Sequence, residues 1–144
     1  MSGYEQGDLI REGRHTVVSH GRRSQDGKPI VIKQLRGLYP DDKALDRFQR
    51  EFDLTRLAAG DKVVEVLDLQ QDRGAVQLIV EDIGGRSLAD QYAERRPSLA
   101  TVLEIAVDLA DALTTVHDSH IIHKDVNPAN VVRNPRTGQL KLID

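Results

Sequence analysis

The chain has 144 residues, of which 39% are hydrophobic, 30% charged and only 3% aromatic, so it is typical of a globular domain with an aliphatic core. A net charge of −3 gives no reason to expect a nucleic-acid partner, and the lack of cysteine excludes disulfides and thiolate metal sites. The N-terminus does not have the pattern of a signal peptide. The longest apolar stretch, 99–116, carries three acidic residues, so we expect a soluble, cytoplasmic protein without membrane insertion.

The first third of the chain has the pattern of β-strands. Apolar runs begin at Asp8 and at Thr16, and the Asp-Gly pair at 26–27 supplies the positive φ that a hairpin turn needs. Residues 29–35 predict a third strand, with Pro29 at its first position, where a missing backbone donor costs little.

The periodicity then changes to that of a helix, followed by two more strands. Asp41 or Asp42 can cap a helix that runs to about Ala59, with one apolar face formed by Leu45, Phe48, Phe52 and Thr55. Residues 63–69 and 75–80 predict strands joined by a turn that contains Gly74. The first half of the chain therefore predicts a five-stranded antiparallel sheet with one helix inserted after the third strand.

The second half is predicted to be mainly helical. Residues 81–85 predict a hinge, because the apolar periodicity stops there and two glycines follow. Ser87 can cap a short helix, and Ser98 can cap a long helix over the apolar stripe at 99–116. Residues 131–133 and 140–143 predict two short strands, and residues 134–138 predict the turn between them.

A polar loop at 123–130 holds Asp125 and Asn130 five positions apart, and the last strand is followed by Asp144. Phosphotransferases of the kinase type assemble their base and metal ligands from an Asp and an Asn at this spacing and an Asp after a following strand. The chain therefore resembles the protein kinase family over essentially its whole length. It looks most like the kinase-like domains at the N-termini of large bacterial multidomain signalling proteins.

The resemblance implies an α+β, protein-kinase-like fold with two lobes. Residues 1–83 would form the N-lobe and hinge, with the five-stranded antiparallel sheet and the helix known as helix C in the family. Residues 84–144 would form a partial, mainly helical C-lobe with helices D and E, the catalytic loop and two short strands. A whole kinase domain extends well beyond this length. We therefore expect a fragment, either a truncated reading frame or the front of a longer protein, with weak nucleotide binding and little or no transfer.

The resemblance also implies ATP and Mg²⁺ as cofactors. Lys33, at the end of the third strand, matches the Lys that meets the α- and β-phosphates, and Glu51 matches the acid that pairs with it. Of the three glycines between the first two strands, only the middle one, Gly13, is present, since Arg11 and Thr16 occupy the other positions. Other positions matching nucleotide-binding residues are Val18, which covers the adenine, Val80, the gatekeeper, and the hinge residues Glu81 and Ile83.

In the polar loop, the resemblance makes Asp125 the base that takes the proton of the substrate hydroxyl, and Asn130 and Asp144 the ligands of Mg²⁺. Lys124 replaces the Arg that pairs with a phosphorylated activation loop. Asn127 replaces the Lys that protein kinases place two residues after the base.

The resemblance leaves more than one function open. An intact domain of this kind would transfer the γ-phosphate of ATP to a protein hydroxyl. Alternatively, a pseudokinase could regulate attached signalling domains as a scaffold or nucleotide sensor, which the reduced glycine loop, Lys124 and Asn127 favour. Small-molecule kinases of the aminoglycoside and choline type also lack a Lys at the position of Asn127. A zinc site built from His117, His120, His123 and Asp125 would need a continuous helix, which Pro128 and the polar loop argue against.

Overall fold

The computed structural model describes residues 3–37 and 40–143, which form two compact units. The first unit comprises residues 1–53 and 66–82, and the second comprises residues 54–65 and 83–144. The lobes expected at 1–83 and 84–144 stay a prediction.

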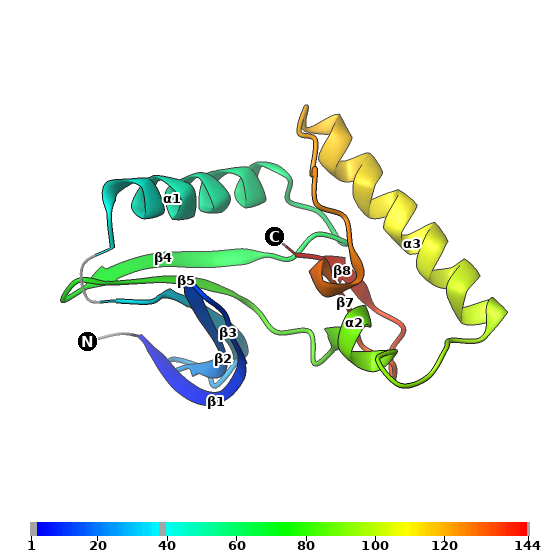
Figure 1. Ribbon diagram of the computed structural model, residues 1–144, viewed down its shortest axis with the longest axis horizontal. Coiled ribbons are helices and arrows are strands. Elements are labelled where there is room, and N and C mark those ends of the chain that lie inside the picture. The colour runs from blue at the N-terminus through cyan, green and yellow to red at the C-terminus, as the bar shows by residue number, and fades with distance from the viewer. Residues whose placement is uncertain (1–2, 38–39, 144) are drawn as a thin grey trace. The chain divides into compact units, whose positions relative to one another are not determined.

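The first unit is built on a sheet in which all neighbouring strands are antiparallel, in the order β1-β2-β3-β5-β4 (Figure 1). Its strands are β1 (Tyr4–Glu12), β2 (Thr16–Arg23), β3 (Pro29–Leu35), β4 (Val66–Asp72) and β5 (Ala75–Glu81). The predicted five-stranded antiparallel sheet is thus confirmed. β1 begins four residues before Asp8, because Tyr4 already pairs with Arg23 of β2. β4 begins three residues after the expected Val63, which instead forms an isolated bridge with Leu142.

Helix α1 (Asp42–Leu57) packs on this sheet because its apolar residues recur on one face. Phe48 is buried with Leu35 and Leu78 of the strands, and the cluster is completed by Ala44, Leu45, Phe52, Val66, Leu69, Val76 and Val80. Asp41 caps the helix, since its Oδ1 accepts a hydrogen bond of 2.7 Å from the amide of Ala44. The helix ends at Leu57, two residues before the predicted Ala59.

The second unit packs the long helix α3 (Leu99–Asp118) against a small sheet with the order β6-β7-β8. Its other elements are β6 (Arg86–Ser87), α2 (Leu88–Gln91), the 3₁₀ helix η1 (Pro128–Asn130), β7 (Val131–Arg133) and β8 (Leu140–Leu142). Ser87 and Ser98 cap α2 and α3 as predicted. The pattern did not predict β6, because two residues are too few to show a period of two.

The core of this unit is aliphatic, as the composition requires. Ala112 and Val116 of α3 are buried with Leu140 and Leu142 of β8, and Ala58, Val63 and Val131 complete the cluster. The other apolar side of α3 is exposed at Leu99, Val102, Leu103 and Val107. Within residues 3–37 and 40–143, no helix combines the length and the apolar character needed to cross a bilayer.

The glycines at 84 and 85 have a geometric reason in the structure. Gly84 has a φ of +74°, which L-residues rarely adopt. A Cβ at Gly85 would lie 2.7 Å from the carbonyl carbon and oxygen of Arg133, so the β6 segment can approach β7 only without a side chain there. Gln91 reinforces this contact, since its Nε2 donates to the carbonyl oxygen of Arg133 at 2.6 Å.

Candidate active site

Lys33 and Glu51 lie in contact in the first unit. The packing of α1 on the sheet brings Glu51 to the side chain of Lys33 on β3, and the Lys33 Nζ donates to both carboxylate oxygens, at 2.8 and 3.0 Å. Both side chains are largely shielded from solvent, with exposed fractions of 17% and 23%. The ammonium also lies 5.8 Å from the centre of the Phe48 ring. The structure thus fixes a cation on the face of the sheet that carries α1.

Val18 lies directly opposite Lys33 in the register of β2 and β3, and Val80 lies opposite Val31 in the register of β3 and β5. Residues paired in this way share one face of a sheet. Because Val31 and Lys33 are two positions apart on β3, they also share that face. The sequence-predicted residues Val18, Lys33 and Val80 are therefore placed on one face.

In the turn between β1 and β2, the backbone of Gly13 takes part in closing the hairpin. The Gly13 amide donates to the carbonyl oxygen of Thr16 at 2.8 Å, which closes the hairpin over Arg14 and His15. A Cβ at Gly13 would find its nearest neighbour, the Thr16 carbonyl oxygen, at 3.4 Å, which is ordinary contact. The turn itself therefore does not need a glycine at this position.

The segment after β5 is held by backbone and side-chain contacts within each unit. In the first unit Glu81 is the last residue of β5 and pairs with Ile30, and the Asp82 amide donates to the carbonyl oxygen of Pro29. In the second unit the carbonyl oxygen of Ile83 accepts a hydrogen bond of 2.9 Å from the Asn134 Nδ2.

In the loop before η1, two amide side chains hold Asp125. The Asn127 Nδ2 donates to the Asp125 Oδ1 at 3.0 Å, and the Asn130 Nδ2 donates to the Asp125 Oδ2, also at 3.0 Å. Asn127 is itself fixed, because its Oδ1 caps η1 by accepting from the Ala129 amide. Asn130 is buried, whereas Asp125 is exposed. The loop therefore presents a positioned carboxylate to solvent.

His123 links this loop to the segment after β8. Its Nδ1 accepts a hydrogen bond from the Asp125 amide, so its Nε2 carries the proton and donates to the Ile143 carbonyl oxygen, each at 3.3 Å. Lys124 between them has a φ of +68°, a sparsely populated conformation for a residue with a Cβ. Because α3 ends at Asp118, His120 and His123 do not lie on its face, and the described residues hold no cluster of three or more His, Cys, Asp or Glu able to bind a metal.

The donor chemistry of the loop fits Mg²⁺, which takes hard oxygen ligands and few of them from protein. In the hydrogen bonds found among residues 3–37 and 40–143, the Asn130 side chain uses only its Nδ2 group, so its Oδ1 is the oxygen that a cation would meet. Asp144, the second predicted ligand, lies outside the described residues.

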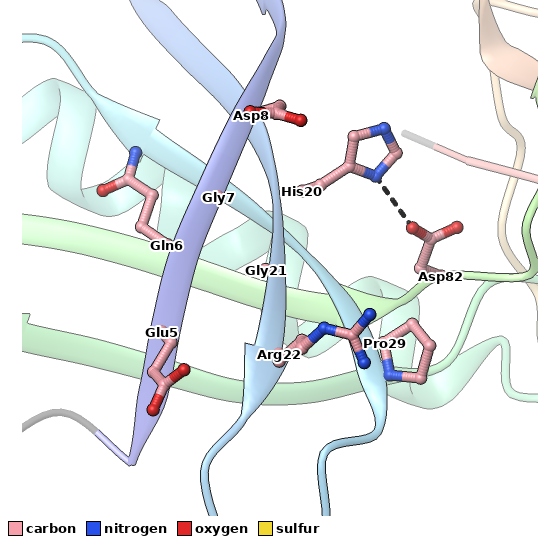
Figure 2. Close-up of a pocket in the computed structure, with 9 residues that line it drawn as sticks. All are labelled: Glu5, Gln6, Gly7, Asp8, His20, Gly21, Arg22, Pro29 and Asp82. Atoms are coloured by element: carbon pink, nitrogen blue, oxygen red, sulfur yellow. Dashed lines mark hydrogen bonds and ion pairs between the residues drawn. The ribbon is translucent and has the colours of Figure 1, made fainter.

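A cavity of about 380 Å³ lies in the first unit, on the strands β1 to β3, and none of the predicted nucleotide-binding residues lines it. Figure 2 shows His20 of β2 beside Asp82, whose Oδ2 lies 2.9 Å from the His20 Nδ1. Three carboxylates line the cavity, those of Glu5, Asp8 and Asp82, with Arg22 as the one strong cation among the lining residues. The excess of negative charge makes this cavity poorly suited to binding a polyphosphate. His20 and Asp82 were not among the site residues predicted from the sequence.

Comparison with known proteins gives the family. The model of the protein kinase domain matches residues 4–144. The chain belongs to the protein kinase domain family.

The relatives of the chain are serine/threonine-protein kinases and other protein kinases. It is 31% identical to a probable serine/threonine-protein kinase of Corynebacterium efficiens, over 98% of the chain and 22% of the relative. It is 30% identical to the serine/threonine-protein kinase pkn3 of Myxococcus xanthus, over 94% of the chain and 26% of the relative. Identity to a MAP kinase kinase kinase of Schizosaccharomyces pombe is 27%, over 98% of the chain and 10% of that protein. The chain thus spans about a quarter or less of the length of these relatives.

Proposed function

We propose that this chain is the ATP-binding part of a serine/threonine-type protein kinase domain. Within such a domain it would transfer the γ-phosphate of ATP to a protein hydroxyl, as a cytoplasmic component of signal transduction. The observation that carries the proposal is the contact between Lys33 and Glu51, a fixed and shielded ion pair on the face of the sheet that also carries Val18. A cation held in this way suits the α- and β-phosphates of a nucleotide.

The chemistry proposed for the loop is an in-line displacement at the γ-phosphorus. The oxygen of a Ser or Thr hydroxyl forms a bond to the γ-phosphorus, the bond to the oxygen bridging the β- and γ-phosphorus breaks, and ADP leaves with that electron pair. Asp125 takes the hydroxyl proton, and the amides of Asn127 and Asn130 hold its carboxylate in place for this transfer.

Mg²⁺ would be held by Asn130 and Asp144, and when bound it neutralises charge on the phosphate oxygens. Asn130 is suited to this role because its buried side chain is anchored to Asp125 through nitrogen, which directs the amide oxygen away from that contact. Val80, Glu81 and Ile83 would receive the adenine, with Glu81 and Ile83 using their backbone groups.

The experiment that tests the proposal is calorimetric titration of the chain with Mg·ATP, with Lys33→Ala and Asp125→Asn as variants. We expect the chain to bind, Lys33→Ala to lose binding and Asp125→Asn to keep it. In a complete kinase domain that contains this chain, transfer of labelled γ-phosphate to a generic protein substrate should fall by about 10²- to 10⁴-fold in Asp125→Asn. No binding by the unmodified chain, or equal binding by Lys33→Ala, would contradict the proposal. Labelling of kanamycin or choline in place of protein would indicate a small-molecule kinase.

A further inference from the structure

Arg36 makes three contacts with the turn between β1 and β2. Its Nη2 lies 2.6 Å from the Glu12 Oε1, and its Nη1 donates to the Gly13 carbonyl oxygen at 3.1 Å. Its backbone amide donates to the His15 carbonyl oxygen at 2.9 Å. One residue thus contacts the last residue of β1, Gly13 and the tip of the turn at His15.

Arg36 is well placed to hold the turn relative to Lys33. It directly follows β3 (Pro29–Leu35) and stands three positions after Lys33, so one continuous segment carries both Lys33 and Arg36. The guanidinium is planar and presents donors in a fixed fork, which allows it to meet a carboxylate and a carbonyl together.

The amino-acid composition of the β1–β2 turn bears on the role of the Arg36 contacts. Glycine-rich turns are mobile, and a mobile turn loses entropy when a ligand orders it. Here Arg11 and Thr16 lie in paired strands, and the Gly13 amide is already bonded to Thr16. The turn is therefore built as a closed hairpin whose position is set by its neighbours.

We propose that Arg36 is a positioning residue that clamps the β1–β2 turn over the nucleotide site, through Glu12 and the Gly13 carbonyl, so that the turn is ordered before ATP binds. This inference rests on the proposed nucleotide site. Arg36 acts through the turn and need not touch the phosphates. Loss of the clamp would weaken nucleotide binding because the turn would then be ordered at the expense of binding free energy.

The alternative for Arg36 is direct attraction of the phosphates, and the two accounts differ in the sign of one effect. If Arg36 acts only through its charge, Glu12→Gln removes a nearby negative charge and should strengthen binding of Mg·ATP. If Arg36 is a clamp, Glu12→Gln removes one of its anchors and should weaken binding. Arg36→Lys also separates the two accounts, because it keeps the positive charge and loses the planar fork of donors. Binding of Mg·ATP should persist if only the charge matters and should weaken if Arg36 is a clamp.

The experiment compares Arg36→Ala, Arg36→Lys and Glu12→Gln in the nucleotide-free and the Mg·ATP-bound chain. Arg23→Ala is the control, because Arg23 forms a partly exposed ion pair with Asp26 at the β2–β3 hairpin and carries the same charge. Amide exchange by NMR reports the order of residues 12–16 without nucleotide, and titration calorimetry gives the Kd of Mg·ATP. Circular dichroism checks folding, which we expect to persist because Arg36 and Glu12 are about half exposed.

We expect all three variants to raise the Kd of Mg·ATP about five-fold and to speed exchange at residues 12–16, while Arg23→Ala does neither. The Arg36→Ala and Glu12→Gln changes should be less than additive, since both break one contact. Tighter binding in Glu12→Gln, or full binding in Arg36→Lys, would overturn the clamp. If the unmodified chain binds and requires Lys33 but all three variants bind within two-fold of it, only the clamp is wrong. If the unmodified chain does not bind, the proposed function fails and the clamp fails with it.

Discussion

The two units place their polar site groups by different means. In the first unit, Lys33 and Glu51 are 18 residues apart and meet because the apolar face of α1 packs on the sheet. In the second unit, Asp125, Asn127 and Asn130 lie within six residues and bond to one another through the loop itself. The difference teaches that the site groups of the first unit depend on tertiary packing, while those of the second unit are set largely by local loop chemistry.

Two glycines, Gly85 in the second unit and Gly13 in the first, differ in how closely a neighbouring backbone segment approaches them. The β6 segment of the second unit meets β7 so closely that a Cβ at Gly85 would lie 2.7 Å from backbone atoms. The β1–β2 turn of the first unit is open enough for a Cβ at Gly13. We therefore expect the same chemical change to have unequal effects in the two places.

The largest expected effect is that of Gly85→Ala, compared with Gly13→Ala. Gly85→Ala should lower the free energy of unfolding by about 3 kcal/mol, because the backbone of Arg133 must move. Gly13→Ala should change it by less than about 0.5 kcal/mol, because the new methyl group makes only ordinary contacts. Urea unfolding followed by circular dichroism measures both. Equal losses in the two variants would show that close approach is not what distinguishes the two glycines.

A smaller effect is expected from removing one partner of each polar pair. Asn130→Ala deletes a buried side chain and its two hydrogen bonds to Asp125, and should cost about 2 kcal/mol of stability. Glu51→Gln keeps the shape of the side chain and one oxygen that can accept from the Lys33 Nζ, so it should cost about 1 kcal/mol, yet weaken Mg·ATP binding because Lys33 loses its orienting charge. The same unfolding measurement and calorimetry separate the two. A stability loss from Glu51→Gln larger than that from Asn130→Ala would reverse the comparison.

The smallest effect concerns acid stability at the β2–β3 turn of the first unit. The Arg23 guanidinium, and after it the Lys28 amide, donate hydrogen bonds to Asp26 and lower its pKa from 3.8 to about 2. A carboxyl group with a lowered folded-state pKa stabilises the fold above its unfolded value, and this contribution is lost as the pH falls from near 3.8 through about 2. The stability difference between the unmodified chain and Asp26→Asn should therefore shrink over that interval.

Urea unfolding at several pH values between about 5 and about 2 measures this difference. Asp46→Asn, on an exposed position of α1, removes the same formal charge away from the turn and serves as the control. A constant difference between Asp26→Asn and the unmodified chain across the interval would contradict the prediction.

Much of the fold was predictable, and the errors concern the ends of elements and the two-residue strand β6. The hairpin turns, the caps at Asp41, Ser87 and Ser98, and the long amphipathic helix were predicted because each depends on residues close in sequence. The start of β4 was wrong because Val63 is used in a bridge to Leu142, a partner that the local pattern does not reveal.

The sequence by itself determined the order of the elements other than β6 and η1, the resemblance to protein kinases and the closeness of Asp125 to Asn130, because these follow from local periodicity, turn chemistry and short spacing. Only the tertiary structure decided that Gly85 must lack a side chain and that Arg36 contacts the β1–β2 turn, and it gave the geometry of the Lys33–Glu51 contact that the resemblance had implied. These contacts join segments that are distant in the chain, and their geometry is fixed by the packing of strands and helices against one another.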